Sequence, residues 1–272
     1  MSVKDLARLK PYSVQLWTGH KWSSYTGASR SGRDGTQMEI ELRSGERISC
    51  TGHHEWPTTK GVKRASSLRR GDVLVRCQLP EPDPRWYAYK LDSEAIGWFI
   101  GTYLADGSMS GDTIQIASHA KEQRRFERLR TLANSYHGTL AIHKTSANGV
   151  TANLNGPVLQ GILSCYLSGR TAHDKHLNPR CWQRGSRFLN ALLMGYLEGD
   201  GHWDEKNERW RLGFCKNYAL ERDLRVLAAR AGARLILKQT LYGFRGEVRF
   251  KRSGHYNERN DAEIVAIRRS KG

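Results

Sequence analysis

A short segment that occurs twice, 94 residues apart, constrains the fold of this chain more than any other feature. Residues 98–107 read WFIGTYLADG, and residues 192–201 read LLMGYLEGDG. The same offset relates two further pairs, which are Gly138 with Gly232 and Lys144 with Lys238. Since one offset holds across a helix end, a turn and a downstream lysine, the sequence predicts two like units, at about 93–160 and 186–252.

Small residues at every fourth position mark one face of the helix expected in each segment. These residues are Gly97, Gly101 and Ala105 in the first segment, and Ala191, Gly195 and Gly199 in the second. Residues with this spacing lie on the same helix face. Glycine inside a helix costs up to ~1 kcal/mol relative to alanine. Its repeated use therefore favours two helices that pack more closely than the usual ~8–10 Å.

Each expected helix ends in an aspartate, Asp106 or Asp200, followed by glycine. If the small faces pair, the two carboxylates meet near a pseudo-twofold axis. Adjacent carboxylates repel unless a cation lies between them, and hard oxygen ligands suit Mg²⁺ together with water. Such metal sites beside DNA suit phosphodiester hydrolysis. The alternative is that both residues simply occupy Asp-Gly turns at helix ends.

The segments FIGTYLADGS (99–108) and LMGYLEGDGH (193–202) resemble the two signature motifs of the LAGLIDADG homing endonucleases, in their single-chain form. The resemblance covers about 94–255. It implies a pseudo-twofold pair of α-β-β-α-β-β units whose saddle-shaped sheets grip double-stranded DNA. It also implies metal-dependent cleavage of both strands, with Mg²⁺ as the cofactor and Mn²⁺ as a possible substitute. Asp106 and Asp200 match the metal-binding acids of the family, and the backbone carbonyls of Ala105 and Gly199 could assist.

The resemblance extends to two lysines. Lys144 and Lys238 each follow their aspartate by 38 positions and resemble basic residues that flank the active sites of the family. They could position water or stabilise charge on the phosphate. The alternatives are plain phosphate contacts or solvated lysines at strand ends. Ser108 in one motif corresponds to His202 in the other, so the two cleavage centres need not be equally active.

The charge of the chain points to a polyanionic partner. The 272 residues carry 44 Lys and Arg against 27 Asp and Glu, a net charge of +17. Nucleic acid suits this excess better than a membrane, because the charge is spread along the chain and no apolar run reaches the ~18–20 residues of a membrane span. Basic residues in strand-like segments are the candidate DNA contacts, namely Arg211, Arg245, Arg249 and Lys251. The alternative is a solvated basic face without a partner.

Local patterns divide the chain at a proline-containing linker, at about 79–92. Before it, alternation at 38–42, a turn at Ser44-Gly45 and a strand over 47–50 predict a hairpin within an all-β section, with another strand at 73–77. After it the predicted fold class is α+β. Helices are expected at 93–105, 121–136, 186–199 and 218–231, and strands at 113–117, 139–143, 151–155, 209–215, 234–240, 246–251 and 263–267.

The all-β section carries a second resemblance. The stretch ISCTGHHEWP (48–57), with KRASSLRRGD at 63–72, resembles part of a Hint (intein splicing) module. Thr51 and His54 match its Thr-x-x-His box, whose members polarise a scissile peptide bond; a near-neutral histidine suits that work. The alternative is a β-hairpin whose histidines lie at the surface and have no catalytic role.

Together the two resemblances predict a partial Hint-like β module and linker at 1–92, an endonuclease domain at 93–255, and a tail at 256–272 that resembles the resumption of a splicing domain. A self-splicing intein begins with Cys or Ser and ends with His-Asn, whereas this chain begins with Met1 and ends Ser270-Lys271-Gly272. Splicing by this chain alone is therefore not expected. Intein fragments that supply the missing groups are possible partners.

The five cysteines are scattered and form no C-x-x-C pair, which favours reduced thiols over a disulfide framework or a zinc module. A monomeric, cytoplasmic, soluble protein is expected. The sequence as a whole predicts a site-specific DNA endonuclease of intein origin. The alternatives are a fragment that splices in trans and a DNA-binding protein that has lost cleavage.

Overall fold

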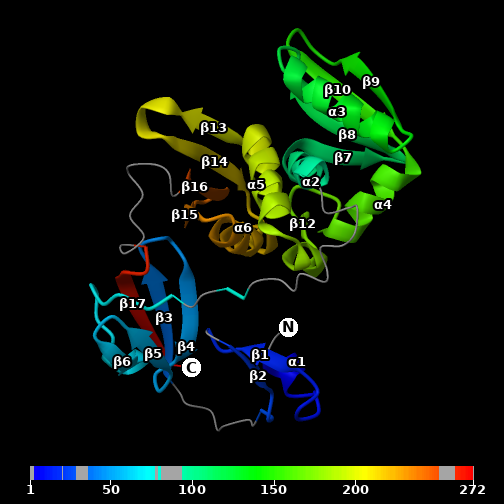
Figure 1. Cartoon of the computed structure of the whole chain (residues 1–272). Helices are drawn as coiled ribbons and strands as arrows, with labels where there is room; N and C mark the ends of the chain where they lie inside the picture. Colours follow the sequence, from blue (N-terminus) through cyan, green and yellow to red (C-terminus); the bar gives the residue numbers. More distant parts are fainter. Residues whose placement is uncertain are drawn as a thin grey trace. The chain divides into compact units, whose positions relative to one another are not determined.

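The computed structural model describes residues 3–19, 21–28, 36–76, 79–80, 94–250 and 261–271. The chain forms two compact units (Figure 1). The first unit combines 1–81 with 257–272, and the second comprises 82–256. No helix among the described residues is long and apolar enough to cross a membrane.

The first unit is built mainly of short antiparallel strands. Its elements are α1 (Val3–Leu6), β1 (Gln15–Trp17), β2 (Trp22–Ser24), β3 (Thr36–Leu42), β4 (Arg47–Thr51), β5 (Glu55–Thr58), β6 (Gly61–Arg64), a 3-10 turn (Ala65–Ser67) and β17 (Ile264–Lys271). The hairpin expected at 38–50 is present, because β3 pairs with β4 with Ile40 opposite Ile48. Met38, Ile40 and Leu42 alternate into a small core, which explains the period of two in the sequence.

The C-terminal strand completes this first unit. In the sheet order β17-β3-β4, β17 lies antiparallel to β3 (Figure 1), with Ile264 opposite Leu42. Ala262 and Ile264 join the same core as Ile40. The strand expected at 73–77 is only partly present. Val73 and Leu74 form isolated bridges, and Cys77 lies outside the described residues.

The second unit contains two halves with the same order of elements. The first half holds α2 (Glu94–Asp106), β7 (Gly107–Ser110), β8 (Thr113–His119), α3 (Gln123–Ser135), β9 (Thr139–Lys144) and β10 (Gly149–Asn155). The second half holds α5 (Ser186–Asp200), β13 (Gly201–Asp204), β14 (Arg209–Cys215), α6 (Tyr218–Arg230), β15 (Ala233–Gln239) and β16 (Gly243–Phe250). Between them lie α4 (Pro157–Tyr166), β11 (Leu167–Ser168), β12 (His176–Leu177) and a 3-10 turn (Pro179–Gln183).

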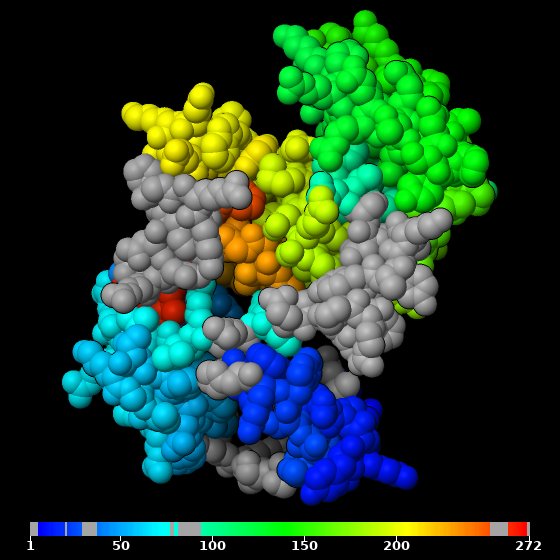
Figure 2. Space-filling view, in the orientation of Figure 1, coloured from blue at the N-terminus to red at the C-terminus, as the bar shows by residue number. Residues whose placement is uncertain are grey.

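Each half forms a four-stranded antiparallel sheet. Sheet I has the order β7-β8-β10-β9, and sheet II has the matching order β13-β14-β16-β15. Helices cover one face of each sheet, and the apolar strand residues on that face enter a shared core. In Figure 2 the green surface of the first half adjoins the yellow and orange surface of the second. The α+β prediction is thus confirmed, while the sequence did not predict α4, which begins at Pro157.

Four of the five cysteines lie among the described residues, and all four are free thiols. Cys181 is the buried one, and burial raises the pKa of its thiol to about 12. A thiol with so high a pKa is not a nucleophile near neutral pH. Its place in the core is therefore that of a small apolar residue.

Candidate active site

The two motif helices, α2 and α5, pack side by side through their glycines (Figure 1). A Cβ added at Gly101 would overlap the Leu192 carbonyl oxygen, and one added at Gly195 would overlap that of Trp98. A Cβ added at Gly97 would also overlap the Phe188 carbonyl oxygen. Backbone meets backbone at these points, as the spacing of small residues predicts. Only glycine fits there, which accounts for its presence in helix interiors.

This contact brings the C-terminal ends of the helices together. Asp106 is the last residue of α2, and Asp200 is the last of α5. A Cβ at Gly199 would lie 2.5 Å from Asp106 Oδ2 and 2.6 Å from the Ala105 Cβ. The carboxylate of one helix therefore lies against the backbone of the other, one residue from its counterpart.

The two aspartates have different surroundings. Asp106 accepts a hydrogen bond from Arg125 Nη2 of α3 at 2.5 Å, within an ion pair. Arg125 is buried and also pairs with Glu122. Burial raises the pKa of Asp200, and the nearby charge of Asp106 raises it further. Tyr196, Lys175 and Arg125 oppose that rise without cancelling it.

Lys175 completes the cluster, and the sequence did not point to it. Its side chain is 4% exposed, and its Nζ donates to the carbonyl oxygens of Tyr103 (3.2 Å) and Gly107 (2.7 Å). Burial lowers the pKa of Lys175, whereas the charges of Asp200 and Asp106 raise it. The ammonium thus holds the end of α2 and partly compensates both carboxylates.

A polar anchor fixes the segment that carries Lys175. Asn217 caps α6 by accepting the Leu220 N–H, and its Nδ2 donates to the carbonyl oxygens of Lys175 and Ala172. Asp223 of α6 accepts the Leu177 N–H. The connection between the halves is therefore held to α6, which fixes where the buried ammonium lies.

The lysines singled out in the sequence lie elsewhere. Lys238 is exposed on sheet II directly opposite Arg245, while Lys144 ends β9 opposite the buried Val150. Side chains alternate across a strand, so the two lysines lie on opposite faces of their sheets. The cations that act on Asp200 are Lys175 and Arg125. A role for Lys144 or Lys238 beside the aspartates stays a prediction.

The four predicted DNA contacts differ in exposure. Arg211 and Arg245 are exposed on sheet II, whereas Arg249 is largely buried and bonded to Glu247 and the Asn207 carbonyl oxygen. Lys251 lies outside the described residues. Two of the four candidates are therefore free to face a ligand, and a third braces its neighbours.

In the first unit Thr51 is the last residue of β4, and His54 follows the short turn at 52–53. The His54 N–H donates to the Thr51 carbonyl oxygen at 3.1 Å, and the imidazole packs against Trp56 with ring centroids 4.7 Å apart. Both residues are exposed. Their side chains are thus accessible on one short turn, and a splicing role for them stays a prediction.

The donor set at the helix ends fits a hard divalent cation. Among the described residues no three His, Cys, Asp or Glu side chains gather in a metal-binding group. Two carboxylates, assisted by the carbonyls of Ala105 and Gly199, would fill only part of a coordination sphere. Mg²⁺ commonly keeps several waters and takes one or two carboxylates plus phosphate oxygens. The residues therefore fit Mg²⁺ shared with a nucleic acid.

Replacing Lys175 with Met should lower the free energy of unfolding by about 1–3 kcal/mol, because two buried carbonyls lose their donor. Urea unfolding of the metal-free protein measures the change. Lys206→Met, at an exposed site, is the matched control and should have little effect. Equal midpoints for the two variants would show that Lys175 does not stabilise this helix end.

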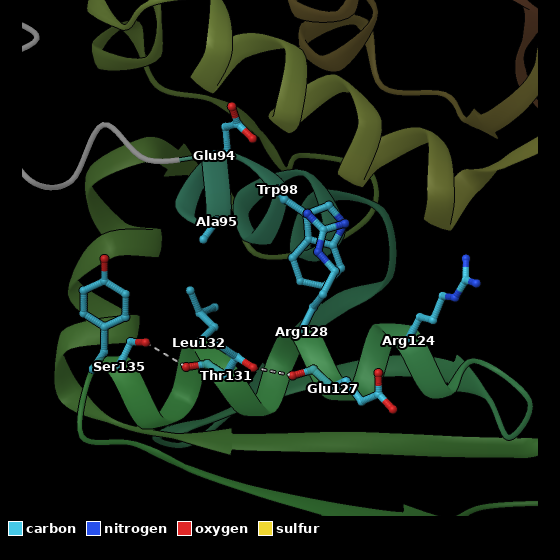
Figure 3. A pocket seen from close by; sticks show the side chains of 10 residues that line it. Glu94, Ala95, Trp98, Arg124, Glu127, Arg128, Thr131, Leu132 and Ser135 are labelled. Carbon is cyan, nitrogen blue, oxygen red and sulfur yellow. Dashed lines mark hydrogen bonds between the residues drawn. The ribbon is translucent and has the colours of Figure 1, made fainter.

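A pocket of about 860 Å³ lies between α2 and α3, and its lining includes Glu94, Trp98 and Arg128 (Figure 3). The Arg128 guanidinium stacks on Trp98 at 3.9 Å, and the Trp98 indole donates to Glu198 at 2.6 Å. Trp98 is two turns of helix from Asp106, or roughly 12 Å along the axis. The pocket is therefore separate from the paired aspartates.

The fold and the site define a basic α+β protein whose two like halves bring two carboxylates together where two helices touch. No protein-family model matches the chain. It is 21% identical to the DNA-directed RNA polymerase subunit Rpo1C of Methanocaldococcus jannaschii, over 70% of this chain and 26% of that protein. The chain thus spans about a quarter of the length of this curated relative.

Two solved structures match part of the chain at low similarity. The N-terminal LAGLIDADG domain of DUF199/WhiA matches 63% of this chain and 80% of its own, with 11% identity and a TM-score of 0.42. I-DmoI in complex with DNA and Ca matches 58% of this chain and 84% of its own, with 14% identity and a TM-score of 0.44. At such low similarity, the case for function rests on the residues of this chain.

Proposed function

We propose that the chain is a LAGLIDADG-type endonuclease that binds double-stranded DNA as a monomer and hydrolyses both strands with Mg²⁺. The observation that carries this proposal is the meeting of Asp106 and Asp200 at the ends of two helices in backbone contact. A buried carboxyl whose pKa is raised by the charge of a neighbouring carboxylate is unfavourable in a purely structural role, and such a pair suits a cation site.

In this proposal Asp106 and Asp200 hold the metal, with help from the carbonyls of Ala105 and Gly199. When bound, the ion would polarise a phosphodiester and favour deprotonation of an attacking water. Lys175 fixes the end of α2, so that Asp106 stays beside Gly199. Arg125 orients the Asp106 carboxylate through their ion pair.

The charge of sheet II supports a polyanionic substrate. Lys238 and Arg245 are directly opposite each other on neighbouring strands, both exposed, and neither forms an ion pair with a described residue. Like charges in this arrangement destabilise a sheet. A DNA phosphate backbone relieves the repulsion, and binding that depends on it weakens steeply with salt.

Cleavage of a library of plasmids with random inserts tests the proposal. Linear product should form with Mg²⁺ or Mn²⁺ and not with EDTA, and sequencing of the ends gives the site. Asp106→Asn should remove cutting, whereas Asp112→Asn, at an exposed turn, should keep it. Cutting by Asp106→Asn at the full rate would disprove the metal assignment.

A binding protein without cleavage is the second candidate, favoured by the ion pair that already engages Asp106. The same library separates the two candidates. Salt-sensitive enrichment of a DNA sequence, with no cutting in Mg²⁺ or Mn²⁺, would establish the binding protein.

A role of the first unit in splicing is a third candidate. The pairing of β17 with β3 places the C-terminal strand in the same sheet as β4, which leads into the turn between Thr51 and His54. Mixing the chain with fragments that supply an N-terminal Cys and a C-terminal His-Asn should then yield ligated product. Folded fragments that yield none would remove this candidate.

A further inference from the structure

The open faces of sheets I and II, which are the faces away from the helices, differ in chemistry. Strand alternation and register place thirteen residues on the open face of sheet I, all within the described range 94–250. They are Ser108, Ser110, Thr113, Gln115, Ala117, His119, Thr139, Ala141, His143, Gly149, Thr151, Asn153 and Asn155. None of these residues is a lysine, arginine, aspartate or glutamate.

Sheet II presents the opposite character. Its open face carries Arg209, Arg211, Arg234, Lys238, Arg245 and Arg249, with Asp204 and Glu247 among them. Cationic side chains therefore dominate one open face and are absent from the other. The two halves related by the offset of 94 residues share their order of helices and strands, but the side chains on their open faces differ.

The acids of sheet II orient its arginines. Asp204 Oδ2 binds Arg209 at 3.0 Å and Arg211 at 2.7 Å, while the Arg211 side chain remains 57% exposed. Glu247 binds Arg209 and Arg249. Arg209 and Arg249 thus brace the face, and the remaining donors of Arg211 stay available to a ligand. A guanidinium held in this way is preorganised for a two-pronged hydrogen bond.

Arg245 has room to lie across the sheet. It is opposite Gly213 on β14, where a Cβ would lie 3.5 Å from Arg245 Cγ. The exposed guanidinium has no hydrogen bond or ion pair to a described residue. Arg211 and Arg245 therefore offer two arginine forks on neighbouring strands.

Sheet I offers amides in their place. Gln115 and Asn153 are directly opposite each other at the centre of the sheet. Asn153 Oδ1 is buried and has no hydrogen-bond partner among the described residues. An unpaired buried acceptor is unfavourable, and a donor from a ligand would satisfy it.

We propose that the two sheets read chemically different halves of one DNA site, with sheet II on a guanine-rich half and sheet I on a half rich in A·T pairs. This inference rests on the proposed DNA-binding function. In the major groove arginine forms paired hydrogen bonds to guanine O6 and N7, and asparagine or glutamine forms them to adenine N6 and N7. Threonine and alanine contact the thymine methyl group.

Selection of bound duplexes from a random library, with the full chain in EDTA, tests the inference. One half of the enriched site should be guanine-rich and the other rich in A·T pairs. Arg245→Gln should weaken discrimination for guanine by about tenfold at one position, and only in the guanine-rich half of the DNA site. Gln115→Ala should weaken the preference for adenine at one position, and only in the A·T-rich half of the DNA site. Arg222→Gln, on the exposed side of α6, should change neither.

Two results overturn the inference. The first is a site whose halves have equal guanine content, and the second is a change in the same half for both variants. If such a site is still cut with Mg²⁺, the inference fails and the proposed function stands. If no sequence is enriched and no DNA is cut, both fail.

Discussion

Asp200→Asn should abolish DNA cleavage while raising the stability of the metal-free protein. Loss of a metal-binding carboxylate should cost several kcal/mol of transition-state stabilisation, or roughly 100-fold or more in rate. The gain in stability follows because burial, together with Asp106, raises the pKa of Asp200. Ionisation of this carboxyl at neutral pH therefore opposes folding. Asparagine keeps the shape and removes that charge.

The dependence on pH identifies the cause. A carboxyl whose pKa is higher in the folded than in the unfolded chain stabilises the fold at acidic pH, and this contribution is lost as pH rises through the folded-state pKa. The difference in melting temperature between Asp200→Asn and the parent, in EDTA, should thus be largest near neutral pH and shrink towards pH 4. A less stable variant at every pH would contradict the proposed repulsion. DNA binding in EDTA should persist.

Gly195→Leu should destabilise the second unit by about 3 kcal/mol, because any Cβ at this position meets the Trp98 carbonyl oxygen. For a unit of this size the melting temperature should fall by roughly 6–12 °C. The helices can accommodate the side chain only by moving apart. Separation of α2 from α5 also separates Asp106 from Asp200, so cleavage should fall even where the protein is still folded.

Gly161→Ala provides the matched control within a helix. Gly161 is exposed on α4, and a Cβ there would meet nothing within 4 Å. Alanine should therefore stabilise the protein by about 0.4–1 kcal/mol through the unfolded chain. Thermal melts of both variants measure the contrast. If Gly195→Leu melted like its parent, the close contact of the two helices would be wrong.

The helix contact could be predicted because its cause lies in local sequence. The spacing of Gly97, Gly101 and Gly195 reports a steric requirement that tertiary context does not change. The hairpin of β3 and β4 has an equally local signal, which is the alternation of Met38, Ile40 and Leu42.

Lys175 could not be predicted in this way. It lies in an irregular connection without periodicity, and its position depends on Asn217, 42 residues further along the chain. Arg125 does have a signal, since it shares the apolar face of α3 with Leu129 and Leu132 at positions i, i+4 and i+7. A charged residue among buried leucines indicates a buried partner, which here is Asp106.

The offset of 94 residues pairs Lys144 with Lys238 in sequence, but the two side chains are not structurally equivalent, because strands have a period of two. A slip of one residue between the halves moves a side chain to the other face of its sheet. Counted across each sheet from Gly107 and Gly201, Lys144 consequently aligns by register with Gln239 rather than with Lys238. Sequence offsets hold for helices in contact and fail where strand register differs.

The pairing of β17 with β3 has a consequence for folding during synthesis. The second unit is continuous and can fold as soon as its own residues leave the ribosome. The first unit must wait, since Leu42 meets its partner Ile264 only after the whole second unit has been synthesised. Until then the outer edge of β3 has unpaired amides and carbonyls, which invite pairing with another chain. Slow translation through the second unit would prolong this exposure, so the need for chaperones should increase as synthesis becomes slower.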